Sequence, residues 1–476
     1  MKYEVVIGLE VHVELSTQSK LFCACSAHFG AEQNENVCPA CAGMPGMPAV
    51  ANKKAIELGV AASLVTNSEI TPVISFDKKN YFYPDLSTGY QITQWFAPIC
   101  RNGYVDINTN GTDKRINLKQ IHIEEDAGKL VHDRGMSLVD YNRASVPLVE
   151  IVSMPDFSNS DEVVAYLEKL RTLLTFAGIS DCKMQEGSMR CDVNLSVRET
   201  GETKLGTRTE MKNMNSLRAI VRAIEFETQR HIDALETGCE VLIQETRRWD
   251  DDLGESFSMR SKETAADYCY FPNPEIMPIV ISDELIAMVR ASLPERADVK
   301  YKRLTEELGV SEYFSGIITG SKKLSEIFDK LMEHSLPAKD VSAWIITELL
   351  SMTTEENKSY EDIVIDCDKF AALISMVDKK VINRAVAKKI LTLIYTDNTD
   401  PVKYVEENNL GMVSDTSFIE EIIINILNEN PDSVRQFKEG KDKVLGFLMG
   451  KVMAKTAGKA DPNVVKEMLA NIIQTV

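Results

Sequence analysis

The chain has 476 residues, a formal net charge of −19, 44% hydrophobic residues and 26% charged residues. This length exceeds one hydrophobic core, so we expect two to four domains. The acidic charge excludes a generally basic surface, and any contact with RNA is expected to use a local basic patch. The composition is that of a soluble globular protein without an apolar run of membrane-spanning length. Because no signal or transit peptide pattern precedes the first strand, we expect a cytoplasmic protein.

The first predicted strand runs from Tyr3 to Leu15, and every odd position in it is apolar. Alternation with a period of two is typical of a strand with one buried face. Glu10, His12 and Glu14 therefore stand in a row on the opposite face. One interpretation is a solvated outer face. Three later segments repeat the pattern, which favours a functional surface.

Four of the ten cysteines are grouped, as Cys23-Ala-Cys25 and Cys38-Pro-Ala-Cys41, with twelve residues between the pairs. Such pairs can take adjacent corners of a tetrahedron, and in a cytoplasmic protein they indicate structural Zn²⁺ rather than disulfides. Reduced thiols without metal are the alternative, because one residue separates the first pair instead of the commoner two to four. The other six cysteines are scattered and are expected to be buried thiols.

Helices are predicted at Lys53–Val65, from Ser160 to about Leu174, and at Leu217–Leu235, from apolar residues at helical spacing. The stretch 76–94 is aromatic and turn-rich, and we expect it to be too irregular for an element of its own. Its rings suit the base of a nucleotide or of an RNA end, with the packing of a long loop as the alternative. Further strands are predicted at Ser137–Tyr141 and Pro147–Val152.

The three later segments with alternating polarity are Gln120–Asp126, Arg190–Arg198 and Thr207–Asn213. Glu125 breaks the alternation of the first, and a β-bulge there is expected to turn Glu124 and Glu125 to one side. If these strands share a sheet with the first, one surface gathers acids, an imidazole and cations. They are Glu10, His12, Glu124, Glu125, Asp192 and Glu210, with Arg190, Arg208 and Lys212 among them.

Several neighbouring carboxylates raise one another's proton affinity unless a cation neutralises them. Oxygen ligands with at most one imidazole suit Mg²⁺ or Mn²⁺ better than Zn²⁺. We therefore predict a metal site there, with Arg190, Arg208 and Lys212 as phosphate clamps around a metal–nucleotide complex. The alternative is a structural network of ion pairs.

The character of the chain changes at Leu293, after which it is helical and rich in Lys and Glu. We place one domain boundary near residues 291–296 and a second near Leu410–Met412. The prediction is an α+β protein with a mainly antiparallel first domain at 1–292, an all-α domain at 293–409 and a small α-helical tail at 410–476.

The tail departs from the acidic balance of the whole chain. From Pro431 onward it holds eight bases and five acids. The bases are Arg435, Lys438, Lys441, Lys443, Lys451, Lys455, Lys459 and Lys466. A basic helical module on an acidic protein is suited to docking an RNA backbone. Routine lysines on a solvated helical face are the alternative.

Seven runs of the sequence together resemble one known family. They are IGLEVHVEL, HFGAEQNENVCPACAGMPG, IHIEEDAGKLVHD, DYNRASVPLVEIVSMPDF, QEGSMRCDVNLSVR, TRTEMKNMNS and GKDKVLGFLMGKVM. The family is the B subunit of bacterial aspartyl/glutamyl-tRNA amidotransferases, and the resemblance extends from Tyr3 to the C-terminus. The related archaeal E subunit carries a synthetase-like insertion domain, for which this chain has no room.

The resemblance implies a β cradle that uses ATP and Mg²⁺ to phosphorylate the side-chain carboxylate of Glu or Asp misacylated onto tRNA(Gln) or tRNA(Asn). It implies a partner A subunit that releases ammonia from glutamine, a small C subunit, and a helical domain and YqeY-like tail that contact the tRNA. It also implies that the six predicted acid and imidazole residues serve the metal and the ammonia path. Catalytic roles are expected for Glu10, His12, Glu125, Asp192 and Glu210. Zn²⁺ would be a stabilising accessory, since some family members lack the four cysteines.

Two alternatives from other classes remain. A non-catalytic tRNA-docking scaffold with a structural zinc site would explain the tail and the cysteines but not the acidic surface. A metal-dependent hydrolase would use the same carboxylates but would not need the helical domain and tail. The sequence holds no recognisable nucleophile motif and no glycine-rich phosphate loop of the Walker type.

Overall fold

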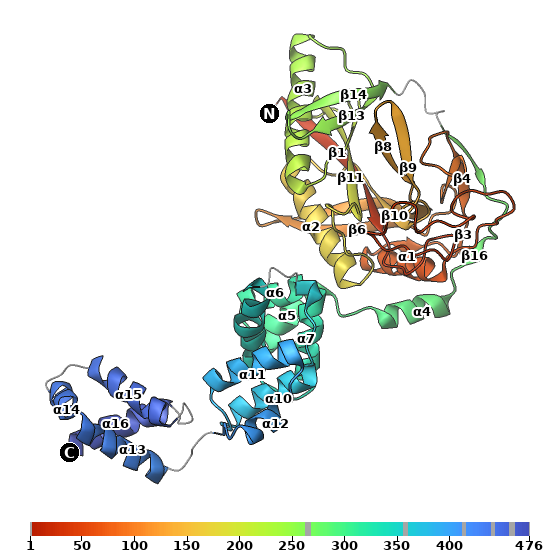
Figure 1. Cartoon of the computed structure of the whole chain (residues 1–476). Helices are drawn as coiled ribbons and strands as arrows, with labels where there is room; N and C mark the ends of the chain where they lie inside the picture. Colours follow the sequence, from red (N-terminus) through yellow and green to blue (C-terminus); the bar gives the residue numbers. More distant parts are fainter. Residues whose placement is uncertain are drawn as a thin grey trace. The chain divides into compact units, whose positions relative to one another are not determined.

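The computed structural model describes residues 2–261, 268–355, 360–411, 416–438, 443–456 and 462–475. The chain divides into two compact units, one ending at Ala297 and one beginning at Asp298. Figure 1 shows strands and helices in the first unit and helices in the second. The predicted α+β class is confirmed. Across the described ranges, no helix combines the length and apolarity needed to cross a membrane.

Nine strands form the central sheet of the first unit. They are β1 (Tyr3–Glu14), β2 (Glu69–Ile70), β6 (Cys100–Thr109), β7 (Thr112–Glu125), β10 (Pro147–Ser153), β11 (Met189–Glu199), β12 (Thr209–Lys212), β13 (Glu245–Asp250) and β14 (Glu255–Ser261). Their order is β14-β13-β12-β11-β1-β10-β7-β6-β2. β12 and β13 pair in parallel, and every other neighbouring pair is antiparallel.

β1 lies in the middle of this sheet and gives it two different faces. Its odd positions Ile7, Leu9, Val11 and Val13 are at most 1% exposed, as the alternation predicts. Helices α1 (Lys53–Val65), α2 (Ser160–Phe176) and α3 (Leu217–Thr237) pack on this apolar face and complete the core. The polar positions of β1 are thereby left on the opposite face of the sheet.

The three covering helices begin where their sequences supply a cap. The side chains of Asn52, Asn159 and Ser216 each accept a hydrogen bond from a first-turn amide. α3 ends at Gly238, whose φ of 66° is the left-handed conformation that glycine adopts most easily. The helices predicted from the sequence at these three places are confirmed.

A second, three-stranded sheet has the order β15-β4-β5, formed by β4 (Asp77–Asn80), β5 (Tyr90–Thr93) and β15 (Cys269–Pro272). The expectation that residues 76–94 hold no element is therefore wrong. Turn residues such as Pro84 and Gly89 separate two strands of four residues each, too short to show a period. Two further pairs are β16 (Ile279–Val280) with β3 (Val73–Ile74), and β8 (Lys129–Asp133) with β9 (Met136–Asp140).

The second unit is helical throughout its described residues. Its helices are α5 (Ala297–Lys302), which begins one residue before the division, α6 (Glu312–Gly320), α7 (Lys322–Met332), α8 (Ala338–Ala343), α9 (Leu350–Glu355), α10 (Cys367–Asp378), α11 (Arg384–Asp397), α12 (Pro401–Glu407), α13 (Thr416–Glu429), α14 (Pro431–Lys438), α15 (Lys443–Lys455) and α16 (Pro462–Thr475), with π turns at Arg303–Glu307 and Trp344–Leu349. Their buried residues form two separate cores, one between Leu304 and Val405 and one between Ile423 and Ile473. In the first unit, α4 (Asp283–Ser292) packs against α1.

The scattered cysteines only partly match the expectation of buried thiols. Cys100, Cys182 and Cys191 are buried, and Cys367 is half-buried. Cys239 and Cys269 are exposed, which contradicts the prediction for these two. Both lie in short segments at the surface of the first unit, where an apolar sequence context does not imply burial.

Candidate active site

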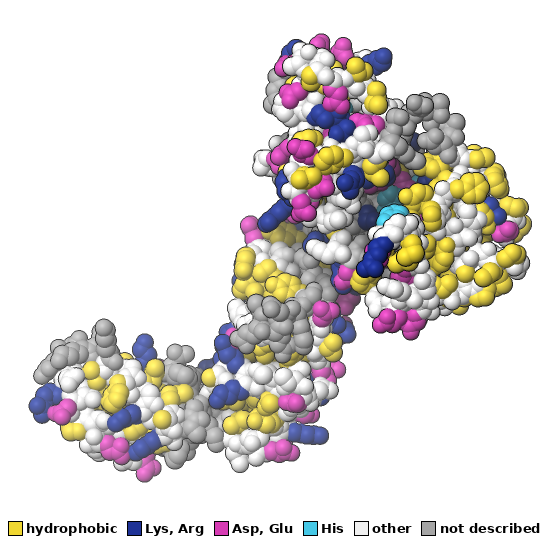
Figure 2. Space-filling view, turned by 45° about the horizontal axis from the view of Figure 1, so that its top comes forward, with side chains coloured by type: hydrophobic (Ala, Val, Ile, Leu, Met, Phe, Trp, Pro, Cys, Tyr) yellow, Lys and Arg dark blue, Asp and Glu magenta, His cyan; other side chains and the backbone are white. Residues whose placement is uncertain are grey.

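The polar face of the central sheet gathers side chains from five strands. Glu10 of β1 lies opposite Asp192 of β11, and His12 lies opposite Glu150 of β10. On the outer neighbours, His122 of β7 is opposite Glu150, and Glu210 of β12 is opposite Asn194 of β11. Figure 2 shows the first unit hollowed between β13–β14 and the small sheet, with acidic and histidine side chains inside.

His12, Glu124 and Glu150, here called the His12 cluster, offer ligand atoms that all lie within 4.8 Å of one another. His12 Nε2 is 3.6 Å from Glu124 Oε1 and 3.5 Å from Glu150 Oε2. His122 Nε2 lies 2.6 Å from Glu150 Oε2. The Thr93 hydroxyl donates to Glu124 Oε2 at 3.1 Å. The two carboxylates and the imidazole of His12 therefore converge, and a second imidazole, His122, bonds one of the carboxylates from outside the cluster.

The charges of the His12 cluster are set by these contacts. Burial by itself would lower the pKa of His12, but Glu150, Glu124 and Asp192 outweigh it and raise that pKa to about 9. Burial would raise the pKa of Glu150, but His122 and His12 hold it well below its usual range. The proton on His12 thus neutralises the same carboxylates that a metal ion would, and His12 would have to release it to act as a ligand.

Glu10, Asp192 and Glu210, here called the Glu10 cluster, also lie within 4.8 Å of one another. Lys212 Nζ donates to Glu210 Oε1 at 2.9 Å and also contacts Asp192 Oδ2. Asn194 Nδ2 donates to Glu10 Oε1 at 3.0 Å. Burial and the neighbouring carboxylates of Glu150, Glu210 and Asp192 raise the pKa of Glu10. The single positive charge of Lys212 is less than the negative charge of three ionised carboxylates.

Three predicted site residues neither belong to the two clusters nor bond to their members. Glu125 follows the regular register of β7 with β10, so the expected bulge at this position is absent. Its carboxylate accepts from the Ile92 amide at 2.8 Å. Arg190 donates to Asp126 Oδ2 at 2.7 Å, and Arg208 is exposed just before β12.

Burial raises the pKa of Glu125 to about 7. Because β7 keeps its alternation to the end, Glu125 points to the face opposite Glu124. It lines a small cavity whose other walls include Cys41, Asp85 and Ser145. Glu125 therefore stands apart from both acid clusters, next to the cysteine loop.

Two members of the site, Glu150 and His122, were not among the candidate residues. Glu150 is the one charged residue of β10, in a strand that is otherwise apolar apart from Ser153. A lone acid in an apolar strand is a signal that could have identified it, since burial of an unpaired carboxylate is costly. His122 shares the alternation of Gln120 and Glu124, and its role follows only from the register with β10.

The chemistry of both clusters fits a hard divalent cation. They present carboxylate oxygens with at most one imidazole each, which is the ligand set of Mg²⁺ and Mn²⁺. In the Glu10 cluster Lys212 already bonds two of the acids, whereas in the His12 cluster imidazoles and a hydroxyl are the partners. The His12 cluster is therefore the better candidate for a metal ion.

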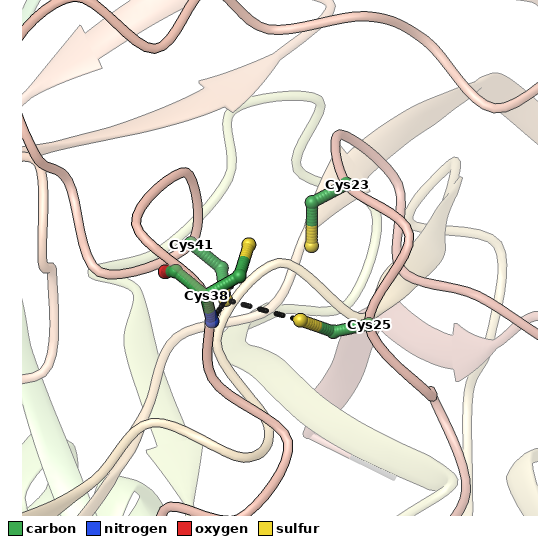
Figure 3. Close-up of side chains that lie close together, drawn as sticks. All are labelled: Cys23, Cys25, Cys38 and Cys41. Atoms are coloured by element: carbon green, nitrogen blue, oxygen red, sulfur yellow. Dashed lines mark hydrogen bonds between the residues drawn. The ribbon is translucent and has the colours of Figure 1, made fainter.

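The four grouped cysteines converge in space from two loops, as Figure 3 shows. Cys41 Sγ lies 4.0 Å from Cys25 Sγ and 3.9 Å from Cys38 Sγ, and all four sulfurs lie within 4.8 Å of one another. A tetrahedral ion with Zn–S bonds of about 2.3 Å places its sulfurs about 3.8 Å apart. The arrangement is therefore compatible with a structural metal site.

The surroundings favour the thiolate form of Cys41. A hydrogen bond from Cys23 is the largest cause that lowers the pKa of Cys41 to about 4, and the Cys38 amide and Lys20 act in the same direction. Lys20 is fully buried, with its Nζ 3.6 Å from Cys41 Sγ and 3.0 Å from the Tyr141 carbonyl oxygen. Gly43 closes the loop with a φ of 71°, where a Cβ would lie 2.4 Å from the Ser87 carbonyl oxygen.

Comparison with known proteins gives matches over the whole chain. A family model described as the GatB/GatE catalytic domain matches residues 5–287, and one described as a GatB domain matches residues 326–473. The B subunit of the aspartyl/glutamyl-tRNA(Asn/Gln) amidotransferase from Lachnoclostridium phytofermentans is 51% identical over 473 residues, which cover 99% of each chain. That from Caldicellulosiruptor bescii is 48% identical over 481 residues and 100% of each chain. The resemblance found in the sequence motifs is thus confirmed, and the chain belongs to the GatB/GatE family.

Proposed function

We propose that this chain is the B subunit of a tRNA-dependent amidotransferase, a carbon–nitrogen ligase. It converts glutamate on tRNA(Gln), aspartate on tRNA(Asn), or both, into the corresponding amide with consumption of ATP. The observation that carries the proposal is the pair of acid clusters on one sheet face of a chain that matches B subunits along its full length.

The reaction needs activation because a free carboxylate is a poor acyl donor. In the first step a side-chain carboxylate oxygen of the aminoacyl group attacks the γ-phosphorus of ATP, and ADP leaves. In the second step ammonia attacks the carbonyl carbon of the acyl phosphate, inorganic phosphate leaves, and a base takes the extra proton. Both steps depend on positioning and charge stabilisation more than on covalent participation by the protein.

We assign the positioning and charge stabilisation to residues according to where they lie on the sheet. His12, Glu124 and Glu150 would hold a Mg²⁺ ion, which neutralises phosphoryl oxygens when it is bound. Lys212 holds Asp192 and Glu210 in place and offers a cation next to Glu10. Arg190 and Arg208 border this surface as candidate phosphate contacts, and Glu125 in its separate cavity is proposed for the ammonia path.

A structural Zn²⁺ at Cys23, Cys25, Cys38 and Cys41 belongs to the same proposal. The sulfur separations suit a tetrahedral ion, and the buried ammonium of Lys20 offsets part of the negative charge of four thiolates. The ion would stabilise the loop without taking part in the reaction, because the cysteines do not belong to either acid cluster.

The partners follow from the family. The names of the relatives describe a B subunit, so we propose a heterotrimer with a glutaminase A subunit and a small C subunit, acting in the cytoplasm. We propose the basic tail as a tRNA contact. There Lys451 donates to Asn430 at 2.7 Å and Lys455 pairs with Glu429 at 2.9 Å. Lys441 and Lys459 lie outside the described residues.

The test is reconstitution of the chain with its A and C subunits. Given misacylated tRNA, ATP, Mg²⁺ and glutamine, the complex should form amidated tRNA and release ADP in step with it. A tRNA-docking scaffold would bind tRNA without ADP release in the presence of ammonia, and a hydrolase would release the free amino acid. Either of those outcomes would contradict the proposed function.

A further inference from the structure

Four aromatic rings form a continuous chain beside the small three-stranded sheet. Trp95 and Tyr270 stack with ring centroids 4.3 Å apart and an interplanar angle of 20°. Tyr268 meets Tyr270 at 6.4 Å and Tyr81 at 5.3 Å, both edge to face. We call Trp95, Tyr270, Tyr268 and Tyr81 the ring chain.

The strand register places the ring chain next to the His12 cluster. Tyr270 of β15, Lys79 of β4 and Gln91 of β5 lie side by side, so they share one face of the small sheet. Thr93, two residues after Gln91, is on the same face and donates to Glu124 at 3.1 Å. The face that carries Tyr270 therefore borders the carboxylates of the proposed metal site.

Lys79 lies on the face of the small sheet between the rings and those carboxylates. Its Nζ lies 4.8 Å from the centroid of Tyr268 and 5.5 Å from that of Tyr81. Burial by itself would lower the pKa of Lys79, but Glu124, Tyr270 and Glu150 raise it, so the side chain is a cation. A half-buried ammonium between π-surfaces and acids is an arrangement that suits an anionic, aromatic ligand.

The outer end of the ring chain is open to solvent. Trp95 is 50% exposed, whereas the two other tryptophans, Trp249 and Trp344, are 1% and 3% exposed. A tryptophan that served only to pack the β5 loop would be covered in the same way. Half of a large aromatic surface, stacked on one side by Tyr270, is instead available to another ring.

We propose that the purine base of an adenosine nucleotide stacks on the Trp95–Tyr270 pair, with Lys79 directing its phosphate towards the His12 cluster. The inference rests on the proposed function and names a subsite for it. Two substrates of that reaction carry this chemistry, namely ATP and the 3′-terminal adenosine of the tRNA. Stacking on an aromatic platform suits either of them, because every base has a π-face.

The first experiment uses Trp95 as its own probe. Acrylamide quenching of tryptophan fluorescence in the full chain reports mainly on Trp95, because Trp249 and Trp344 are buried. ATP should protect Trp95 from the quencher if it is the source, while tripolyphosphate should not. Alternatively, tRNA with its terminal adenosine should protect it and tRNA shortened by that nucleotide should not. If no adenosine-containing ligand alters the quenching, the inference is overturned.

The second experiment measures amidation by the complete heterotrimer. Trp95→Ala and Tyr270→Ala should raise the KM of one adenosine source roughly fivefold or more, with kcat changed less than twofold, because stacking adds binding rather than chemistry. Trp95→Phe should restore most of the affinity. Phe29→Ala, at a side chain that is 76% exposed elsewhere in the first unit, is the matched control.

The outcomes separate this inference from the proposed function. Unchanged KM values for both ATP and tRNA in an active wild-type complex would overturn the base subsite and leave the transamidation intact. Absence of amidation by the wild-type complex would instead contradict the function, while protection of Trp95 by a nucleotide would still identify a purine site.

Discussion

The two faces of the central sheet hold buried carboxylates in opposite ways. On the helix-covered face, Glu227 of α3 is fully buried and bonds Arg230 at 2.9 Å, Arg247 at 3.0 Å and the Ser256 hydroxyl. Arg247 also bonds Glu245 at 2.8 Å. This group, with Thr209 and His231 at its edge, is here called the α3 network.

In the Glu10 cluster on the polar face, the acids outnumber the cations. Lys212 bonds Asp192 and Glu210, while burial and the neighbouring carboxylates raise the pKa of Glu10. The comparison indicates how a structural ion-pair network differs from a binding site. In the α3 network the buried carboxylate is paired with arginines of the same chain, which holds the strands and the helix together. In the Glu10 cluster the negative charges exceed the positive ones, so a cationic ligand can bind there.

The largest effect is expected on the polar face. Glu150→Gln removes a carboxylate that both imidazoles contact, and Asp192→Asn removes one from the Glu10 cluster. Each should lower tRNA-dependent amide formation at least about a hundredfold, because charge stabilisation in the transition state is lost. Glutaminase activity of the partner is the control, measured in the same complex. Wild-type amidation in both variants would refute the assignment of the clusters as the active site.

The same isosteric change on the helix-covered face should act on stability instead. Glu227→Gln removes one of the two carboxylates shared by the half-buried guanidinium groups of Arg230 and Arg247, since Glu245 remains, and should destabilise the first unit by about 3 kcal/mol. The measurement is denaturant unfolding, with Glu225→Gln at an exposed position of the same helix as the control. Amidation per folded molecule should stay near wild type. If Glu227→Gln lowers amidation per folded molecule without lowering the free energy of unfolding, the α3 network is not merely structural.

Metal analysis tests the four grouped cysteines, of which Cys41 is buried and the other three are half-buried. Protein purified without chelators should contain about one Zn²⁺ per chain, and chelation should lower thermal stability more than activity at moderate temperature. Cys38→Ser should reproduce the loss of stability, with Cys239→Ser at an exposed thiol as the control. Elemental analysis that finds no zinc would count against the site.

His231 gives the α3 network a pH dependence. Burial and Arg230 lower its pKa from 6.5 to about 4. Below pH 6.5 the unfolded chain therefore binds a proton that the folded chain does not, and stability falls as the pH drops towards 4. The full loss is about 3 kcal/mol. Unfolding of the first unit, followed by Trp249 fluorescence, should lose less stability between pH 6.5 and 5 in His231→Asn than in the wild type.

The smallest effect is expected in the tail, where charges are exposed. Lys451→Ala and Lys455→Ala should each reduce the salt dependence of tRNA binding by about one unit of slope. Lys379→Ala and Lys380→Ala, at exposed lysines directly after α10, are the controls. A tRNA titration at several salt concentrations measures the slope. If the salt dependence of tRNA binding is the same for all four variants, the tail lysines do not contact tRNA and are ordinary solvated side chains.

The sequence was sufficient to predict which face a side chain occupies where a strand is long and alternates regularly. The alternation of β1 predicted both faces of the sheet and the side of Glu10 and His12, and the alternation of two later segments did the same for Asp192 and Glu210. Glu150 was missed because its partners are set by the pairing of β10 with β1 and β7, which no local pattern encodes. Tyr270 joins Lys79 across 191 positions of chain for the same reason.

The central place of β1 also sets the order in which the protein can fold during synthesis. Both of its neighbours come later in the chain, β10 from Pro147 and β11 from Met189. At typical rates of translation, β11 follows β1 out of the ribosome roughly 10–40 s later. During that time Ile7, Leu9, Val11 and Val13 have no completed core to enter. A chain that ends before Met189 leaves β1 with an open edge, so N-terminal fragments of this length should aggregate rather than fold.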